Sequence, residues 1–312
     1  MFPEISIIMA AYNGGQYLSE QINSVLGQSC KEWQLIIRDD NSGDNTRDII
    51  KEYTQRYPEK IKLVSDGDGN VGASQNFLRL LGHTNADYIM FCDQDDIWLP
   101  DKIKITLDKV KEIEKKYGIN TPVLIHTDLK VVDKDLNVIA DSFWKYQRLN
   151  PEKGKTLNRL LVQNVVTGCT VMINRALKDK IKLLPEQTIV YDWWIALAAV
   201  AFGKIDYAPT ATVLYRQHDN NNIGAKEWNL GYIMNMARLN MGNFRTILQK
   251  TQLQAKAFLD IFRSELTEKD IDLLNVYSTL GRQNLFVRRL NLIKYNFFKM
   301  GFIRNIGLFL SV

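Results

Sequence analysis

Short apolar runs alternate with amphipathic stretches through the first hundred residues, and this alternation constrains the fold most strongly. Each run has the length of a strand, and the stretch after it repeats apolar residues at helical spacing. Strands are expected over 5–11, 33–38, 61–65 and 88–92, and helices over 17–26, 46–57 and 72–81. Repeated strand–helix units of this length form a mostly parallel, doubly wound sheet.

The pattern becomes mixed in the second half of the chain and ends in helices. Helices are expected over 99–116 and 191–202, and strands over 122–132, 137–140, 169–173 and 211–215. From about residue 225 onward the strand signals vanish. We therefore expect an α/β protein with a Rossmann-like, mostly parallel central sheet, a mixed second half and a C-terminal helical segment.

The composition excludes several classes of protein. At 46% hydrophobic and 24% charged residues, the chain is neither disordered nor collagen-like. Its three cysteines, Cys30, Cys92 and Cys169, form no CxxC pair, which suits a reducing compartment and predicts a cytoplasmic protein. The N-terminus lacks a basic leader region, and no stretch reaches about 18 uncharged apolar residues, so we expect no membrane span.

Positive charge is concentrated at the C-terminal end. The net charge is +5, yet the residues after Asp272 include six basic side chains and no acidic one, which leaves −1 for the rest. The basicity is therefore local, and we expect no nucleic-acid partner.

The same C-terminal segment has an amphipathic pattern. Arg288 and Lys299 are expected opposite an apolar stripe at i, i+4, i+7 and i+11, formed by Phe286, Leu290, Ile293 and Phe297. A basic amphipathic helix suits an anionic membrane surface. The alternative is a helix that packs on the preceding domain or on a second subunit, and the sequence leaves homo-oligomer formation open.

Polar clusters follow the four strands expected in the first hundred residues. Ligands of open parallel sheets bind outside the carboxyl ends of the strands. Acidic groups gathered there repel one another, which a divalent cation or ligand hydroxyls would offset. Acids that cap helix N-termini are the alternative. The clusters are Tyr12-Asn13, Asp39-Asp40, the 66–72 turn and 93–96.

The turn Gly67-Asp68-Gly69-Asn70-Val71-Gly72 matches GxGxxG, the fingerprint of dinucleotide-binding proteins. It follows the third expected strand rather than the first, and Asp66 and Asp68 would repel a pyrophosphate. We therefore interpret it as a tight turn that needs glycine. A nicotinamide-dependent oxidoreductase stays open as an alternative.

Four segments in order, IIMAAYNGG, IIRDDNSGDNT, GNVGASQNF and IMFCDQDDIWLPDKI, resemble the family 2 glycosyltransferases, which have the GT-A fold. The resemblance extends over about residues 4–220. CDQDDIW, YDWW and YRQHDNN look most like the bacterial rhamnosyltransferases, which transfer L-rhamnose from dTDP-L-rhamnose. The family resemblance implies a transferase domain over 1–224, with a nucleotide-binding half over about 1–100 and an acceptor half over about 101–224. A helical extension over 225–312 follows.

The resemblance implies a nucleotide-sugar site at the strand ends. Tyr12 would lie against the base, unless it packs on a helix, and Asp40 would accept the N–H of a thymine or uracil imide. Asp39 would support its loop, and Asp93 would contact the ribose or the diphosphate. The other nucleotide-sugar contacts implied are Ala11, Asn13, Gly72, Asn76 and Gln94.

The resemblance also implies a divalent cation, Mg²⁺ or Mn²⁺, with Asp95 as its main ligand and Asp96 as the alternative. Hard cations of this kind take carboxylate oxygens. His218 would complete the metal site or touch the diphosphate, although a lone histidine is often structural. No Cys/His set has the spacing of a zinc site.

The catalytic base implied by the resemblance is Asp192, which would take the proton of the acceptor hydroxyl. An N-cap of the helix that follows is the alternative role for Asp192. The acceptor side would include Asp128, Gly168 and Cys169. Trp193 and Trp194 would either stack on a sugar or belong to the core.

The implied reaction is an inverting, metal-dependent transfer from a nucleoside-diphosphate sugar to a saccharide or lipid-linked acceptor, in cell-surface polysaccharide synthesis at the inner face of the membrane. The rivals are the oxidoreductase above, a non-catalytic carbohydrate-binding protein on the same fold, and a phosphatase. Asp96 disfavours the phosphatase, which would carry Thr or Val at that position. The donor sugar, acceptor and linkage stay open.

Overall fold

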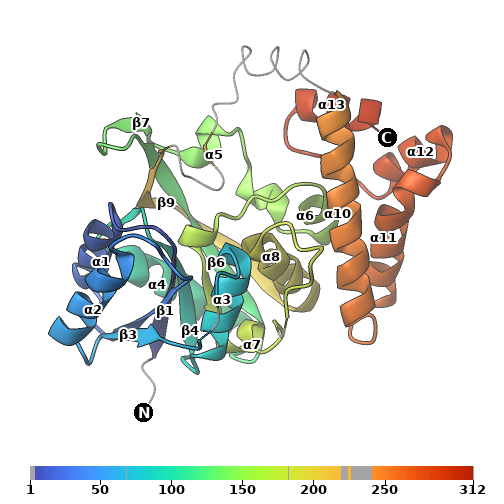
Figure 1. Cartoon of the computed structure of the whole chain (residues 1–312). Helices are drawn as coiled ribbons and strands as arrows, with labels where there is room; N and C mark the ends of the chain where they lie inside the picture. Colours follow the sequence, from blue (N-terminus) through green and yellow to red (C-terminus); the bar gives the residue numbers. More distant parts are fainter. Residues whose placement is uncertain (1–3, 68, 182, 219–223, 226–240, 312) are drawn as a thin grey trace. The chain divides into compact units, whose positions relative to one another are not determined.

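The computed structural model describes residues 4–67, 69–181, 183–218, 224–225 and 241–311 (Figure 1). The chain folds into two compact units. The sheet unit comprises Met1–Phe143, Val166–Leu184 and Gly203–Ala225, and the helical unit comprises Trp144–Val165, Pro185–Phe202 and Lys226–Val312. Two segments before residue 224 thus belong to the same unit as the C-terminal helices. The functional division into 1–224 and 225–312 stays a prediction.

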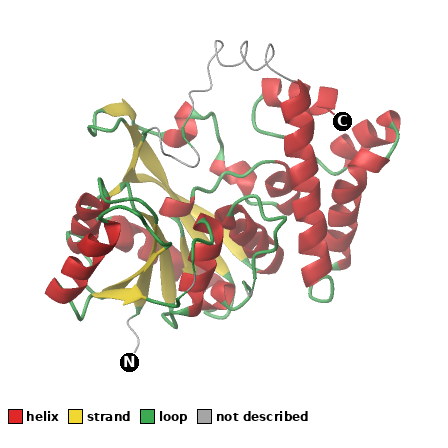
Figure 2. Ribbon diagram, in the orientation of Figure 1, coloured by secondary structure: helices red, strands yellow, loops and turns green. Residues whose placement is uncertain are grey.

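The sheet unit contains one mixed sheet of nine strands in its described part (Figure 2). Their order is β3-β2-β1-β4-β8-β6-β9-β5, and β7 pairs with β6. The strands β3, β2, β1 and β4 are parallel, as are β6 and β9, whereas β8, β5 and β7 pair antiparallel with their neighbours. The bounds are β1 Ile5–Ala11, β2 Trp33–Asp39, β3 Ile61–Val64, β4 Tyr88–Asp93, β5 Ile97–Trp98, β6 Val123–Val132, β7 Val138–Ala140, β8 Met172–Asn174 and β9 Lys204–Arg216.

Burial explains why the first strands form. All residues of β1 except Ala10 are buried, although successive side chains point to opposite faces. A strand buried on both faces belongs inside a helix-covered sheet. The helices of this unit are α1 Leu18–Leu26, α2 Thr46–Arg56, α3 Ala73–Gly82, α4 Lys102–Tyr117 and α7 Arg175–Lys178. The expected α/β fold with a parallel first half and a mixed second half is confirmed.

Two strands differ from expectation. The expected strand over 169–173 is a 3-10 turn, η2 (Gly168–Thr170), followed by the short β8. The strand expected over 211–215 is the end of the longer β9, and β5 was not expected. The first half of β9 buries only Ile205 and Ala208, three positions apart, and its pairing with β6 is irregular around Asp128, so it shows no simple period-two pattern.

The helical unit has an aromatic core. The ring of Trp194 packs edge-on against Phe258, with 5.2 Å between centroids, and Phe258 also contacts Phe202 and Phe262. Its elements are α5 Phe143–Tyr146, which starts on the last residue of the sheet unit's first segment, η1 Pro151–Gly154, α6 Leu157–Val162, α8 Tyr191–Phe202, α10 Met241–Phe262, α11 Glu268–Thr279, η3 Leu280–Arg282, α12 Leu285–Lys294 and α13 Phe302–Ser311. In the described part of the chain, no helix combines the length and apolarity needed to cross a bilayer.

The C-terminal stripe is shorter than expected. Helix α12 ends at Lys294, and Asn296 adopts a φ of 55°, which turns the chain. Phe297 is consequently buried against Tyr277, with 4.9 Å between ring centroids. Lys299 is also withdrawn from solvent, and burial lowers its pKa to about 8. The expectation was therefore wrong in continuing the helical stripe to Phe297 and in placing Lys299 on its opposite face, because the helix ends at Lys294.

Candidate active site

The carboxyl ends of β1, β2 and β4 lie side by side at one edge of the sheet. Ala11 pairs with Asp39 of β2, and Ala10 pairs with Asp93 of β4. Because these strands are parallel, the polar residues that follow them emerge at the same edge. The clusters that begin at Tyr12, Asp39 and Asp93 thus form one rim.

Gln94 ties the loop after β4 to the end of β1. Its side-chain oxygen accepts the N–H of Tyr12, and its amide nitrogen donates to the carbonyl of Tyr12, both at 2.8 Å. A Cβ at Gly14 would lie 2.1 Å from Oε1 of Gln94, so the Gln94 amide would have to move. The phenol of Tyr12 stays 48% exposed on the rim.

The loop after β2 is held by Asn13 and Asp39. The backbone N–H of Asn13 donates to Oγ of Ser42 at 2.9 Å, and Oδ1 of Asn13 accepts the N–H of Gly43 at 2.8 Å. Asp39 accepts from the N–H of Ser42 at 3.0 Å and from Arg47 at 2.6 Å. Asp39 thus bonds to its own loop and to the first turn of α2.

Asp40 anchors the 66–72 turn from inside the rim. Its buried carboxylate accepts from Arg38 at 2.8 Å and from the backbone N–H groups of Val71 and Gly72 at 2.9 and 2.8 Å. The φ of +80° at Gly72 favours glycine. Both oxygens of Asp40 therefore have partners in this structure, so a contact between Asp40 and a base stays a prediction.

Arg38 and Asn76 line the inner side of the same turn. Arg38 is buried and also pairs with Asp66 at 2.7 Å. This hydrogen bond holds the pKa of Asp66 below its usual value. Asn76 donates to the carbonyl of Arg38 at 3.3 Å, while its buried Oδ1 has no hydrogen-bond partner among the described residues. Asp68 lies outside the described residues.

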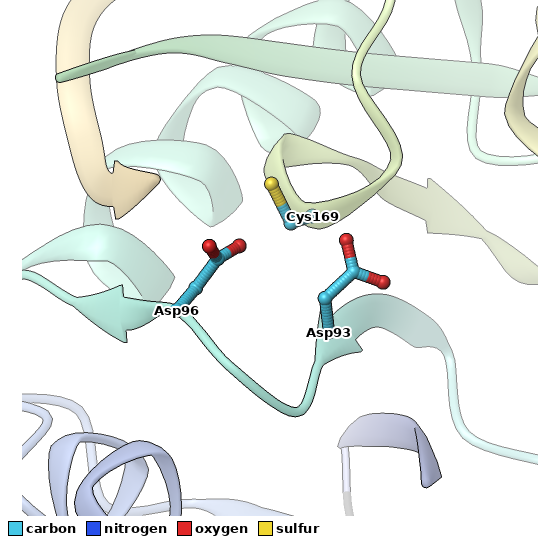
Figure 3. A group of neighbouring side chains, drawn as sticks. All are labelled: Asp93, Asp96 and Cys169. Carbon is cyan, nitrogen blue, oxygen red and sulfur yellow. The ribbon is translucent and has the colours of Figure 1, made fainter. Parts of the chain in front are cut away.

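Asp93, Asp96 and Cys169 turn toward one another, with their ligand atoms within 4.8 Å (Figure 3). Asp96 is fully buried, and burial, with the charges of Asp95 and Asp93, raises its pKa. Burial also raises the pKa of the Cys169 thiol, which disfavours the thiolate that binds metals. Cys169 is thus buried beside the two acids, and its place on the acceptor side stays a prediction.

Asp95 and His218 form a separate, partly exposed pair beside this cluster. Nε2 of His218 lies 2.8 Å from Oδ2 of Asp95, and the two side chains are 12% and 18% exposed. The ring of Tyr17 lies beside the imidazole, with 4.9 Å between centroids. Asp95 and His218 are 123 positions apart in the sequence, and the end of β9 brings them together.

Arg216, the last residue of β9, holds this geometry and was assigned no role from the sequence. Its N–H donates to Oδ1 of Asp96 at 3.1 Å, and its Nε donates to the carbonyl of Asp95 at 2.9 Å. The buried guanidinium also pairs with Glu20 and lies 4.4 Å from the ring centre of Tyr17. Its place at a strand end, two residues before His218, is the signal that could have identified it.

The donor atoms fit a divalent cation. Carboxylate oxygen suits Mg²⁺ and Mn²⁺, and Mn²⁺ also accepts imidazole nitrogen. Asp95 and His218 can be reached from solvent, whereas Asp96 is buried with a raised pKa. Exposure is thus an argument for Asp95, whereas the proximity of Asp93 and Asp96 is an argument for Asp96, and the main ligand stays a prediction.

Asp192 belongs to the helical unit, in the first turn of α8. Its Oδ1 accepts from Nδ2 of Asn164 at 3.1 Å. Since α8 begins at Tyr191, Asp192 lies inside the helix rather than at its N-cap. Asp95 belongs to the sheet unit, so the pairing of Asp192 with the metal side of the site stays a prediction.

The residues expected at the acceptor side differ in environment. Nε1 of Trp193 donates to the carbonyl of Leu160 at 2.6 Å, and Trp194 is fully buried, so both rings belong to the core of the helical unit. In the sheet unit, Asp128 lies at an irregularity of β6 and accepts from Oγ of Ser142 at 2.5 Å. Gly168 is buried in η2.

Comparisons with known proteins agree on one family. Residues 6–181, more than half of the chain, match the family model of glycosyl transferase family 2. The dTDP-rhamnosyl transferase RfbG of Shigella flexneri is 32% identical over 232 residues, which cover 70% of this chain and 74% of RfbG. TuaG of Bacillus subtilis, a glycosyltransferase named for teichuronic acid biosynthesis, is 29% identical over 227 residues, which cover 72% of this chain and 83% of TuaG.

The fold is also similar to solved structures. Residues 1–349 of TarS from S. aureus, in complex with UDP-GlcNAc, superpose with a TM-score of 0.57 at 19% identity. The alignment covers 93% of this chain and 77% of the TarS chain. This similarity supports the GT-A fold.

Proposed function

We propose, since this chain belongs to glycosyl transferase family 2, that it moves L-rhamnose from dTDP-L-rhamnose to a saccharide or lipid-linked acceptor. The reaction would invert the anomeric carbon and depend on a divalent cation. It would serve the synthesis of a cell-surface polysaccharide in the cytoplasm, at the inner face of the membrane. The observation that carries the proposal is the pairing of Asp95 with His218 on the rim formed by the strand ends.

The donor and the pathway are supported by the relatives. RfbG is a dTDP-rhamnosyl transferase, and at 32% identity it shares most of its length with this chain. TuaG is named for the biosynthesis of a cell-wall polymer. The family match supports a transferase over the oxidoreductase alternative, and the GxGxxG turn follows β3 rather than the first strand.

The nucleotide would lie on the rim beside β1. The half-exposed ring of Tyr12 offers a flat apolar face to the base. Asp40 would accept the imide N–H of thymine, in addition to the bonds it already makes with the 66–72 turn. Asp93 would contact the ribose or the diphosphate. The remaining contacts proposed are Ala11, Asn13, Gly72, Asn76 and Gln94.

Asp95 and His218 would hold the cation, and Asp96 would support their loop through its bond with Arg216. The bound cation would supply positive charge against the leaving diphosphate. Arg216 keeps the backbone of Asp95 in place, so the ligand pair is preorganised before the donor arrives.

The acceptor hydroxyl needs a base because its pKa lies far above 7. Asp192 would take this proton as the new glycosidic bond forms and the bond to the nucleoside diphosphate breaks. Its bond with Asn164 orients the carboxylate, and the N-terminus of α8 is a favourable place for its negative charge. Asp128, Gly168 and Cys169 are the proposed residues of the acceptor side.

A thermal-shift panel of sugar nucleotides, each with and without Mn²⁺, tests the proposal. A ligand that binds only the folded state raises its stability by mass action. We expect dTDP-L-rhamnose with Mn²⁺ to give the largest shift, followed by dTDP. A larger shift with a UDP or GDP sugar would overturn the donor assignment, and no shift with any sugar nucleotide would overturn the transferase proposal.

A further inference from the structure

Helix α12 turns an apolar stripe toward solvent. Phe286, Leu290 and Ile293 recur at i, i+4 and i+7, and all three are exposed, Phe286 to 73%. Leu292 is fully buried on the inner side. Scattered exposed apolar residues are normal, but this spacing places them on one face of the helix. The outward face of α12 is therefore apolar, which is unusual for a surface helix.

Helix α13 has a second stripe of the same kind. Phe302, Ile306 and Leu310 recur at i, i+4 and i+8 and are exposed, Phe302 to 80%. Arg304 and Leu308 are buried on the inner side. Clustered apolar exposure of this extent marks an interaction surface.

Exposed positive charge accompanies the stripe of α12. Residues 273–312 contain no aspartate or glutamate. Arg282, Arg289 and Lys294 are exposed within or just before α12, while Arg304 is buried. Helix α12 thus combines exposed apolar and exposed basic residues, which is the pattern of helices that lie in the interface of an anionic bilayer.

A second copy of the chain fits this surface less well. The commonest dimer interface brings the same patch of both subunits together. The exposed basic residues of both copies would then lie in one interface, and residues 273–312 contain no acidic residue to pair with them. Charge complementarity thus favours an anionic lipid surface over self-association.

We propose that the outward faces of α12 and α13 bind an anionic lipid surface. The stripes led by Phe286 and Phe302 would enter the boundary between headgroups and acyl chains, and Arg289 and Lys294 would lie near lipid phosphates. The proposal rests on the proposed function in one respect, that a lipid-linked acceptor lies on the same surface. The binding itself requires no turnover.

Flotation of the full chain with vesicles tests this proposal. We expect binding to phosphatidylcholine vesicles that contain one third phosphatidylglycerol, weaker binding at high salt, and little binding to phosphatidylcholine alone. F286S and F302S should each weaken binding about tenfold. Replacing Arg289 and Lys294 by serine should weaken it about fivefold per residue.

Ile119→Ser is the matched control, because Ile119 is 70% exposed but lies in the sheet unit. We expect it to bind vesicles as the unaltered chain does. If I119S and F286S lose vesicle binding to the same extent, the proposal is overturned. It is also overturned if vesicles with and without phosphatidylglycerol bind the chain equally well. Leu290→Ser serves as a second probe should F286S fail to fold.

Two further readouts separate the possible failures. The first is sedimentation analysis. If the chain is a dimer that F286S dissociates, and the chain does not bind vesicles, the lipid proposal is overturned in favour of self-association. The donor-induced thermal shift is expected to be the same in F286S and the unaltered chain. If the chain binds vesicles but no sugar nucleotide shifts its melting temperature, only the transferase proposal is overturned. If a sugar nucleotide shifts the melting temperature but the chain does not bind vesicles, only the lipid proposal is overturned.

Discussion

At the residue scale, consecutive acids have different roles because their side chains meet different surroundings. Asp95 faces His218 and solvent, while its neighbour Asp96 is buried and bonded to the backbone of Arg216. A buried carboxylate with a raised pKa tends to be protonated, whereas a partly exposed one can exchange water for a cation. The predictions at this scale concern the two carboxylates proposed to carry the chemistry.

Asp95→Ala should weaken metal-dependent donor binding at least tenfold, because it removes the proposed main ligand of the cation. Calorimetry of dTDP-L-rhamnose binding, with and without Mn²⁺, measures this. Asp48→Ala, on the exposed side of α2, is the matched control and should bind the donor normally. Equal donor affinity of D95A and the unaltered chain in Mn²⁺ would contradict the assignment.

Asp192→Asn should keep donor binding and lose about 10²-fold or more in turnover, because the amide cannot take the proton of the acceptor. Steady-state kinetics beside donor calorimetry separates the two effects. Asp179→Asn, an exposed aspartate just after α7, provides the control. Undiminished turnover in D192N would end the assignment of Asp192 as the base.

At the element scale, the site depends on how strand ends are connected to one another. Gln94 joins the ends of β4 and β1, and Arg216 joins the end of β9 to the loop before β5. These bonds replace regular sheet pairing beyond the last residues of the strands. They hold short loops in one conformation, which is what a preorganised ligand site requires.

Gly14→Ala should break the connection between β1 and β4. The new Cβ would lie 2.1 Å from Oε1 of Gln94, so the amide must move and its two bonds with Tyr12 are lost. At about 1 kcal/mol per hydrogen bond, we expect a loss of about 2 kcal/mol in the free energy of unfolding. Urea denaturation measures it, and donor binding should weaken as well.

Gly43→Ala is the matched control for this substitution, because nothing lies within 4 Å of a Cβ at Gly43. It should change neither stability nor donor binding appreciably. If G14A were as stable as G43A, the Gln94 connection would have no energetic role.

At the scale of the whole molecule, charge and burial are distributed unevenly between the segments. The basic residues of the last forty positions belong to the helical unit, and two of them, Lys299 and Arg304, are turned inward. Withdrawing an ammonium group from water costs free energy that depends on pH. The free energy of unfolding should therefore depend on pH partly through Lys299.

Lys299→Met should reduce the rise of the free energy of unfolding with pH between about pH 8 and 10. In the folded chain the pKa of Lys299 is lowered to about 8 by burial, so in this window the unfolded state binds more protons. The free energy of unfolding then rises with pH, by up to about 1.4 kcal/mol per unit from this group. Urea denaturation at pH 8 and 10 measures the slope.

The exposed Lys269 of α11 supplies the comparison, since K269M should leave the slope unchanged. Because other groups titrate in the same window, only the difference between K299M and the unaltered chain is diagnostic. A slope identical in all three proteins would mean that Lys299 keeps its ordinary pKa in the fold.

Local patterns in the sequence were sufficient to predict the parallel half of the sheet and the rim. Strand and helix periods are local properties, and parallel pairing puts all strand ends at one edge. Tyr12, Asp40 and Asp93 could therefore be placed near one another without a structure. The apolar residues of β1 and β4 likewise indicated strands buried on both faces.

Only the tertiary structure decided which side chains of the rim face solvent and which are buried. The orientation of Asp95 and Asp96 depends on Arg216, more than a hundred residues away, and Cys169 reaches Asp96 through a short turn that the sequence suggested was a strand. Phe297 was misplaced for a similar reason, because a turn at Asn296 ends the helical period. Periodicity reports local backbone preference, whereas burial is set by whatever distant segments pack against each side chain.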